Sequence, residues 1–512
     1  MILLETLHLP FSWDWVPENR ISPRIRSSSA VWTLLFGLIF FLSAPVAGVS
    51  QTARYELGKR LRSFEEALET ESDLQTRRVA TDHLDAAVRC FFQFRLRRAA
   101  RFIDLGTMAL RGGEKPTRFW AASLRVHGTR AVLDAKERFL DVKIEPFYDS
   151  GESVPESIRL HWMLREKENG STLAFGDFPV RSLPTQVEIS IPSLPEGDYR
   201  VEFEWKRGGV SVGGRHQTLS IVKDARSRVY RIGQEIEGLA SDVDSSHEAT
   251  LREHRRILGH LVGGTRVMET DFSTLQLLRD AESTLRSVQK IDRAIDRSRS
   301  GSFWYTFDLS GHRVPCRLYL PEGTRNIGSR PLVIALHGVG GSENMFFDTY
   351  GAGKIVNLCR DRGWGLLCPR LGVWSRIPMA LLIQSMVDRF GVDPEQIFLL
   401  GHSMGAGHAL SAVKKRPGLF RAVGFLSVRG SARSGEKWLD LPMFLATADR
   451  DFSRKPTLSF YQKLLTAGSK RVYLREYTAE HLAVVQLCLS DLFQFFDAAH
   501  NGHRYDPHSS SR

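Results

Sequence analysis

A serine stands between two glycines where an apolar run ends, in the stretch 396–410, QIFLLGHSMGAGHAL. The residues before Gly401 have the pattern of a buried strand, and those after Gly405 have the pattern of a helix. A strand that turns directly into a helix at Ser403 needs a tight turn, in which flanking glycines relieve crowding. Such a turn lifts the serine hydroxyl above the edge of a sheet. The stretch therefore predicts that Ser403 is a nucleophile.

A serine hydroxyl reacts only when a base removes its proton, and a carboxylate orients that base. In the chain order nucleophile, acid, base, both partners follow the serine. His481 follows the predicted strand 471–477 and is the expected base. Asp449 is the first residue after the apolar run LPMFLATA, whereas Asp451 lies between Arg450 and Arg454 and is interpreted as a solvated loop charge. We therefore predict Asp449 as the acid.

Acyl transfer also needs donors for the oxyanion of the tetrahedral intermediate. One expected donor is the backbone amide of Met404, and the other is the amide of Val339 or Gly340, in the stretch PLVIALHGVGG. One such donor stabilises a transition state by about 3 kcal/mol. The glycine-rich turn matches neither the GxGxxG nor the GxxxxGK[ST] phosphate motif, so no nucleotide cofactor is expected.

Residues from about 303 to 498 resemble an α/β-hydrolase, specifically the polyhydroxybutyrate-depolymerase and feruloyl-esterase group of secreted serine esterases. Prolyl-oligopeptidase-like enzymes share much of the pattern. The stretches that carry the resemblance are PLVIALHGVGG, FGVDPEQIFLLGHSMGAGHAL, LATADRDF and REYTAEH. The resemblance implies a Ser403, Asp449, His481 triad, with ATAD at the position of the family's GxxD. The chain departs from the family's glycines at Ala406, Ala446 and Glu480.

The periodicity of the sequence predicts several regions ahead of this part. Apolar runs that alternate with helical segments predict an α/β fold with a mostly parallel sheet in the C-terminal region. A period of two earlier in the chain predicts a β-sandwich of immunoglobulin-like type. The predicted regions are 51–115 (helical, with two packed helices), 116–224 (β-sandwich-like), 225–300 (helical linker), 301–500 (catalytic α/β-hydrolase domain) and 501–512 (disordered tail).

The composition excludes some classes of function. The formal net charge of the 512 residues is +12, but no clustered basic module is evident, so nucleic-acid binding is not expected. The five cysteines have no zinc-ligand spacing and an odd number, so neither a metal site nor a disulfide scaffold is expected. The histidines at 247, 254 and 260 lack the HExxH spacing and are interpreted as exposed or capping residues.

The N-terminus has the features of an export signal, so residues 1–50 are predicted to be a signal peptide or membrane anchor. The uncharged apolar run AVWTLLFGLIFFL, residues 30–42, follows three arginines and precedes SAPVAGVS. Val46 and Gly48 could be the small residues before a cut; alternatively, residues 30–49 stay as an anchor. Either outcome predicts an exported protein, whether periplasmic, at the cell surface or secreted.

The sequence as a whole predicts an exported serine hydrolase that cleaves carboxylic esters, small or polymeric, through an acyl-enzyme. One alternative is a serine peptidase of the prolyl-oligopeptidase-like type. Another is a binding protein whose hydrolase domain is inactive. The β-rich region could contact a polysaccharide or another protein.

Overall fold

The computed structural model describes residues 49–506, except for 114, 168, 241–242, 290–294 and 324–329. The predicted signal or anchor, residues 30–48, lies outside the described residues. No helix in the described part of the chain is both long enough and apolar enough to cross a membrane. The chain from Ser50 onward forms one compact unit.

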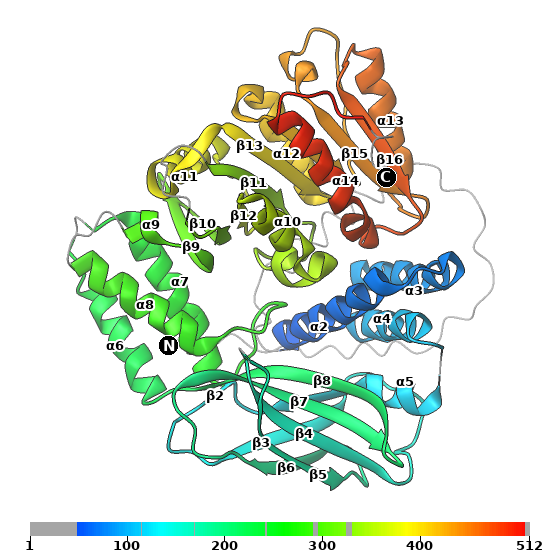
Figure 1. The fold of residues 1–512 in the computed structure, drawn as a ribbon, viewed down its shortest axis with the longest axis vertical. Coiled ribbons are helices and arrows are strands. Elements are labelled where there is room, and N and C mark those ends of the chain that lie inside the picture. The colour runs from blue at the N-terminus through cyan, green and yellow to red at the C-terminus, as the bar shows by residue number, and fades with distance from the viewer. Residues whose placement is uncertain are drawn as a thin grey trace, which may run out of the picture. The chain divides into compact units, whose positions relative to one another are not determined.

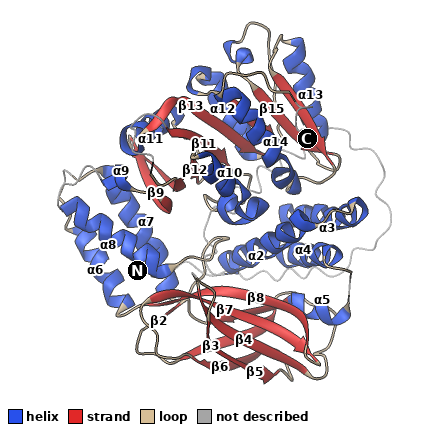
Figure 2. Ribbon diagram, in the orientation of Figure 1, coloured by secondary structure: helices blue, strands red, loops and turns tan. Residues whose placement is uncertain are grey.

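A sheet of eight strands dominates the C-terminal half (Figures 1 and 2). Its order is β16-β15-β14-β13-β11-β12-β10-β9. β9 and β10 pair antiparallel, as do β10 and β12, and every other pair is parallel. The strands are β9 (Gly301–Leu309), β10 (His312–Leu320), β11 (Arg330–Leu336), β12 (Gly365–Pro369), β13 (Val392–His402), β14 (Ala422–Leu426), β15 (Met443–Ala448) and β16 (Val472–Tyr477). The predicted mostly parallel sheet is confirmed.

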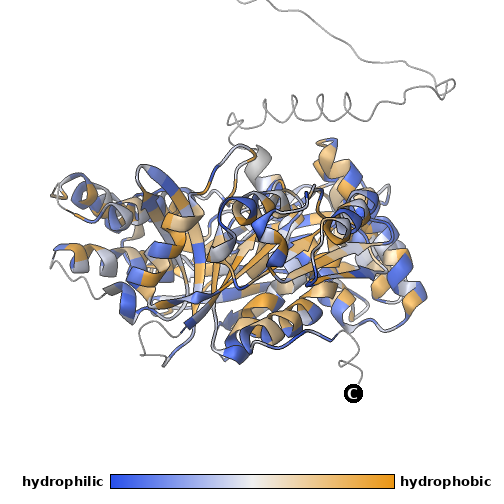
Figure 3. Ribbon diagram, turned by 90° about the horizontal axis from the view of Figure 1, so that it is seen from above, coloured by the Kyte–Doolittle hydropathy of each residue, from blue (hydrophilic) through white to orange (hydrophobic). Residues whose placement is uncertain are grey.

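Helices cover both faces of this sheet, which explains why the central strands are apolar throughout. In β11, Val333 and Ala335 face one core cluster, and Leu332, Ile334 and Leu336 face the other. Figure 3 shows the hydrophobic colouring concentrated in the central strands. The first face is covered by α10 (Lys354–Arg362) and α14 (Ala483–His500); the second by α11 (Met379–Phe390), α12 (Met404–Lys415) and α13 (Arg454–Thr466).

Four helices, rather than the two predicted, precede the β-rich region. They are α2 (Val49–Thr70), α3 (Leu74–Phe92), α4 (Leu96–Leu110) and α5 (Pro116–Ser123). The side chain of Asp73 caps α3 by accepting a hydrogen bond from the amide of Thr76. Leu61 and Phe64 of α2 and Leu84 of α3 belong to the same core cluster as α10 and α14. The N-terminal helices therefore pack on the sheet's own covering layer and share its core.

Residues 124–221 form two antiparallel sheets around one core, which confirms the predicted β-sandwich. One sheet has the order β1-β3-β6 and the other the order β2-β8-β7-β4-β5, with only the short β2 pairing in parallel. The strands are β1 (Leu124–Gly128), β2 (Val132–Leu133), β3 (Phe139–Pro146), β4 (Ile158–Glu166), β5 (Thr172–Pro179), β6 (Thr185–Ser190), β7 (Gly197–Arg207) and β8 (Val210–Ile221).

The region 225–300 is packed rather than a simple linker. It contains α6 (Ala225–Glu237), α7 (Ser245–Val262), α8 (Thr274–Gln289) and α9 (Ile295–Ser298). The interpretation of its histidines as exposed or capping is wrong for two of them. His247 is buried, with Nε2 3.1 Å from both carboxylate oxygens of Asp296, and His254 is buried, with Nε2 3.3 Å from the carbonyl oxygen of Trp304. Both rings therefore attach α7 to the region around β9.

The first residues of the predicted disordered tail are also packed. Tyr505 is buried in the core cluster of α14, and its ring lies 5.2 Å from that of Tyr473. Residues 507–512 lie outside the described part of the chain. All five cysteines are buried and free.

Candidate active site

Ser403 occupies a strained turn between β13 and α12. Its φ of 54° and ψ of −115° are a rare combination for an L-residue and cost about 1–3 kcal/mol unless the surroundings impose them. The amide of Ser403 donates to the carbonyl oxygen of Leu426 over 2.9 Å. A Cβ at Gly405 would lie 2.1 Å from the carbonyl oxygen of Leu336, and a Cβ at Gly401 would lie 2.4 Å from that of Gly405. The glycines are therefore required where α12 crosses the sheet.

The structure brings His481 to Ser403, but it does not bring Asp449 to His481. His481 Nε2 lies 3.0 Å from Ser403 Oγ, and His481 Nδ1 lies 2.8 Å from Oδ1 of Asp451. Asp449 is exposed, and its carboxylate accepts a hydrogen bond from the amide of Ala479 over 3.0 Å. The predicted acid is thus corrected to Asp451.

The reason for the correction is a turn directly after β15. The amide of Asp451 donates to the carbonyl oxygen of Ala448 over 3.1 Å, which folds the chain back and carries Asp451 under the base. The arginines that suggested a solvated Asp451 have other partners: Arg450 pairs with Asp82 of α3, and Arg454 pairs with Glu476. The buried Asp451 side chain is consequently free to face His481.

Hydrogen bonds keep the Asp451 carboxylate ionised although it is buried. Ser427 and Thr447 donate hydroxyls to Oδ2, and Ser453 donates its amide and its hydroxyl to Oδ1. Burial raises the pKa of Asp451, but the hydrogen bond and charge of His481, together with the hydroxyls of Ser427 and Ser453, outweigh burial and hold the pKa below its usual value. An ionised Asp451 can orient His481 and stabilise its protonated form.

The predicted oxyanion loop follows β11 and lies against Ser403. A Cβ at Gly338 would be 3.4 Å from the Cβ of Ser403. The amides of Val339 and Gly340 donate to no group among the described residues, whereas the amide of Gly338 donates to Tyr350 Oη over 3.4 Å. Met404 is the first residue of α12, so its amide has no partner within the helix. These three amides remain the predicted oxyanion donors.

Two further buried histidines hold this loop and the base. His337 Nε2 accepts the amide of Leu371 over 2.9 Å, so Nδ1 carries the proton and donates to the carbonyl oxygen of Gly338 over 2.7 Å. His402 Nε2 donates to the carbonyl oxygen of His481 over 2.9 Å, and Nδ1 accepts the hydroxyl of Tyr350 over 2.8 Å. Burial, then the nearby His481, lowers the pKa of His402 to about 3, which keeps it neutral.

Glu480, the departure next to the base, caps the following helix. Its carboxyl oxygens accept the amides of Leu482 and Ala483 over 2.8 and 2.6 Å. Burial is the largest effect on its pKa and, against those two amides, raises it to about 8. Glu480 is therefore largely uncharged at neutral pH and does not place a full negative charge beside His481.

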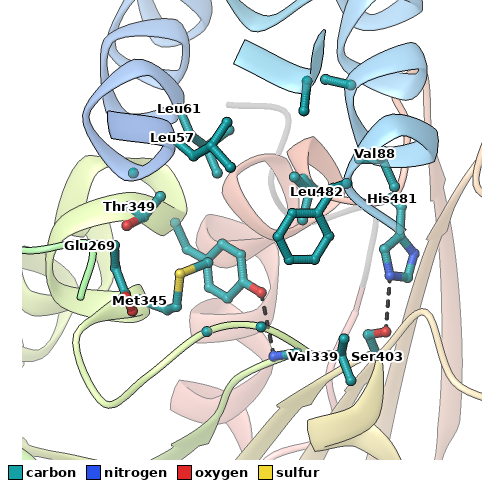
Figure 4. A pocket seen from close by; sticks show the side chains of 18 of the residues that line it. Leu57, Leu61, Val88, Glu269, Val339, Met345, Thr349, Ser403, His481 and Leu482 are labelled. Atoms are coloured by element: carbon teal, nitrogen blue, oxygen red, sulfur yellow. Dashed lines mark hydrogen bonds between the residues drawn. The ribbon is translucent and has the colours of Figure 1, made fainter. Parts of the chain in front are cut away.

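A cavity of about 110 Å³ opens onto Ser403 and His481 (Figure 4). Its walls come from the oxyanion loop, from the segment Met345–Tyr350 and from helices α2, α3 and α4. Figure 4 shows Leu57, Leu61 and Val88 on the side opposite Ser403. The sequence assigned these helical residues to an ordinary core, and their three- and four-residue spacing gave no signal that they face an active site.

Residues missed by the sequence also tie the N-terminal helices to the oxyanion loop. Arg54 of α2 donates to the carbonyl oxygen of Gly340 over 3.0 Å and pairs with Glu269 over 3.4 Å. Glu269 in turn accepts the amide and the hydroxyl of Ser342 over 2.9 and 2.5 Å. No local motif marks Arg54 or Glu269, because their partners lie far away in the sequence.

The strand order and the serine turn define the fold as that of an α/β-hydrolase. No protein-family model and no curated protein sequence matches the chain. Among solved structures, the chain is similar to a thermostable esterase, at 14% identity over 74% of this chain and 99% of that chain, with a TM-score of 0.36. It is also similar to a ferulic acid esterase (15%, 39% and 100%, TM-score 0.33) and to an S-formylglutathione hydrolase of Staphylococcus aureus (13%, 39% and 98%, TM-score 0.32). At these identities and TM-scores, the similarity does not identify a substrate.

Proposed function

We propose that the chain is a serine hydrolase that cleaves carboxylic esters through an acyl-enzyme. The observation that carries the proposal is the continuous hydrogen-bonded line from Ser403 Oγ through His481 to Asp451, with distances of 3.0 and 2.8 Å. The strained backbone of Ser403 supports it, because such strain clusters at functional sites.

In the proposed reaction, Ser403 Oγ attacks the acyl carbon while His481 Nε2 takes the hydroxyl proton. The amides of Met404 and of Val339 or Gly340 would stabilise the resulting oxyanion. His481 then gives its proton to the leaving alcohol as the ester bond breaks. Water, activated by His481, releases the acid and restores Ser403. Asp451 stays ionised throughout and stabilises the histidine cation.

Labelling with a short-chain fluorophosphonate, together with hydrolysis of an acetate ester, tests the proposal. We expect the purified chain to be labelled at Ser403, and Ser403→Ala to lose both labelling and all but a residual activity, a drop of roughly 10⁴ or more. An unchanged far-ultraviolet spectrum and unfolding midpoint would exclude misfolding as the cause. Near-normal turnover by Ser403→Ala would contradict the proposal.

Two alternatives make different predictions in the same assays. A serine peptidase would also be labelled, but it would cleave peptide amides faster than esters of the same acyl group. A binding protein with an inactive hydrolase domain would be neither labelled nor active. The hydrogen bond between Ser403 and His481 argues against the second alternative.

We also propose that the protein is exported, because basic residues, an apolar run and small residues occur in order at residues 20–50. N-terminal sequencing of protein from fractionated cells tests this. We expect a chain that begins near Val49, or an uncut chain in the membrane fraction. A full-length chain in the soluble cytoplasm would contradict export.

A further inference from the structure

Three helices turn apolar stripes toward the nucleophile across the cavity. α3 presents Leu84, Ala87, Val88 and Phe91, which are spaced at three and four residues and so share one face of the helix. α2 adds Leu57 and Leu61, and α4 adds Ala99 and Ile103. The ring of Phe91 rests against the oxyanion loop, since a Cβ at Gly340 would be 2.4 Å from its Cζ. Apolar side chains thus continue from the reacting serine to the far wall (Figure 4).

The charged groups of the lining are already paired. Arg54 is bound to Glu269 and to a carbonyl oxygen of the loop, and Glu269 is bound to Ser342. Among the described lining residues, Thr349 Oγ1 is the only buried side-chain polar atom without a partner. The cavity therefore has no free charge to bind an ionic group, and burying an unpaired charge there would be unfavourable.

We propose that this cavity binds the acyl chain, and that the substrate is an ester of an uncharged aliphatic acid of medium length. The inference rests on the proposed function and adds the class of acid to it. A cavity of about 110 Å³ has room for on the order of eight water-sized groups, if each takes 10–15 Å³. It can enclose a chain of several methylenes but not a chain of sixteen carbons.

In the acyl-enzyme, the acyl carbon is bonded to Ser403 Oγ and the chain extends under α2, α3 and α4. The alcohol has left with the proton from His481. The apolar wall lowers the free energy of every state in which the chain is buried, relative to free enzyme and ester. Because the transition state for acylation is one of these states, kcat/KM should rise with chain length until the cavity is full.

Hydrolysis of acetyl, butyryl, octanoyl and palmitoyl esters of one alcohol by the purified full chain tests the inference. Each buried methylene should raise kcat/KM up to about fourfold, so we expect octanoate to exceed acetate by ~30-fold or more. Palmitate should fall below octanoate. An ester whose acyl chain ends in a second carboxylate should be a poor substrate at every length.

Two matched variants on α3 separate filling of the cavity from other effects. Val88 lines the cavity and is 5% exposed, whereas Val79 on the same helix is 40% exposed and is not part of the lining. Val88→Phe should lower the octanoate-to-acetate ratio by ~10-fold or more, because the ring takes the space of several methylenes. Val79→Phe should leave the ratio unchanged. If Val88→Phe does not fold, Ile103→Phe applies the same test from α4.

The outcomes separate this inference from the proposed function. A flat chain-length series, or equal ratios for Val88→Phe and Val79→Phe, would overturn the acyl-chain assignment while labelling of Ser403 still supported a serine hydrolase. Absence of both labelling and ester hydrolysis would contradict the function, and the inference with it.

Discussion

Asp449 and Asp451 are separated by one residue, yet only one can act on the base. Asp449 is exposed and accepts one backbone amide, whereas Asp451 is buried and receives bonds from His481, Ser427 and Ser453. The difference arises because the turn after β15 directs the second carboxylate, not the first, into the protein.

Substituting each aspartate by asparagine tests this assignment. Asp451→Asn should lower kcat by about 10⁴, because an amide neither holds the required histidine tautomer nor stabilises its cation. Asp449→Asn should stay near wild type, since its amide oxygen can still accept the amide of Ala479. Steady-state kinetics on an acetate ester measures both. The reverse pattern would restore Asp449 as the acid.

Gly405 and Gly407 allow a second comparison at the residue scale. Gly405→Ala should lower the free energy of unfolding by about 3 kcal/mol or more, or prevent folding, because the Cβ would lie 2.1 Å from a backbone oxygen of β11. Gly407 is exposed on the same helix with nothing within 4 Å of its Cβ position, so Gly407→Ala should stabilise by about 0.5–1 kcal/mol. Urea unfolding measures both, and equal effects would contradict the close crossing.

At the scale of elements, the site lies at the carboxyl ends of neighbouring parallel strands. Ser403 follows β13, Ser427 follows β14, Asp451 follows β15 and His481 follows β16. Parallel strands end at the same edge, so residues that are far apart in sequence meet there. The adjacency of β13 to β16 is therefore what assembles the hydrogen-bonded line.

The packing of α7 on β9 predicts a pH dependence of stability. Burial, and then the charge of Arg299, lowers the pKa of His254 to about 4, so near pH 5 the unfolded chain binds a proton that the folded chain does not. Stability is therefore lost as pH falls below about 6.5, by about 2 kcal/mol between pH 7.5 and 5. His254→Gln should show a smaller loss by that amount in urea unfolding.

The exposed His312 of β10 supplies the control for the substitution itself. His312→Gln should keep the wild-type difference in unfolding free energy between pH 7.5 and pH 5. If His254→Gln keeps that difference too, the buried neutral state of His254 is wrong.

At the scale of the whole molecule, the N-terminal helices complete the catalytic half. Glu65 of α2 accepts the amides of Gly351 and Ala352, and Gln486 of α14 donates to the carbonyl oxygen of Glu65 over 2.8 Å. Their apolar faces share one core with α10 and α14. The structure thus argues against the expectation, drawn from the change of composition near Gly301, that residues before it are dispensable for hydrolysis of a small ester.

Truncation tests this dependence. A chain of residues 301–512 should bind an apolar dye, aggregate and hydrolyse acetate esters at least ~100-fold more slowly, because it exposes the core shared with α2–α4 and releases the oxyanion loop from Arg54. A chain of residues 50–512 is the control and should remain folded and active. A soluble, fully active 301–512 fragment would contradict this view.

The sequence alone determined the elements, because their signals are local. The apolar runs predicted the mostly parallel sheet, and the period of two predicted the sandwich. The pattern around Ser403 predicted the strained turn, since glycine is needed wherever backbone segments approach within contact of a Cβ. The position of His481 after the last strand also followed from chain order.

Only the tertiary structure decided which acid faces the base and what covers the serine. The choice between Asp449 and Asp451 depends on one turn and on donors from β14, which are distant in sequence. The apolar spacing of Leu57, Leu61 and Val88 is the same for a helix that packs on a core and for one that lines a cavity. Burial against a partner is a property of the partner as well, so no single helix sequence contains it.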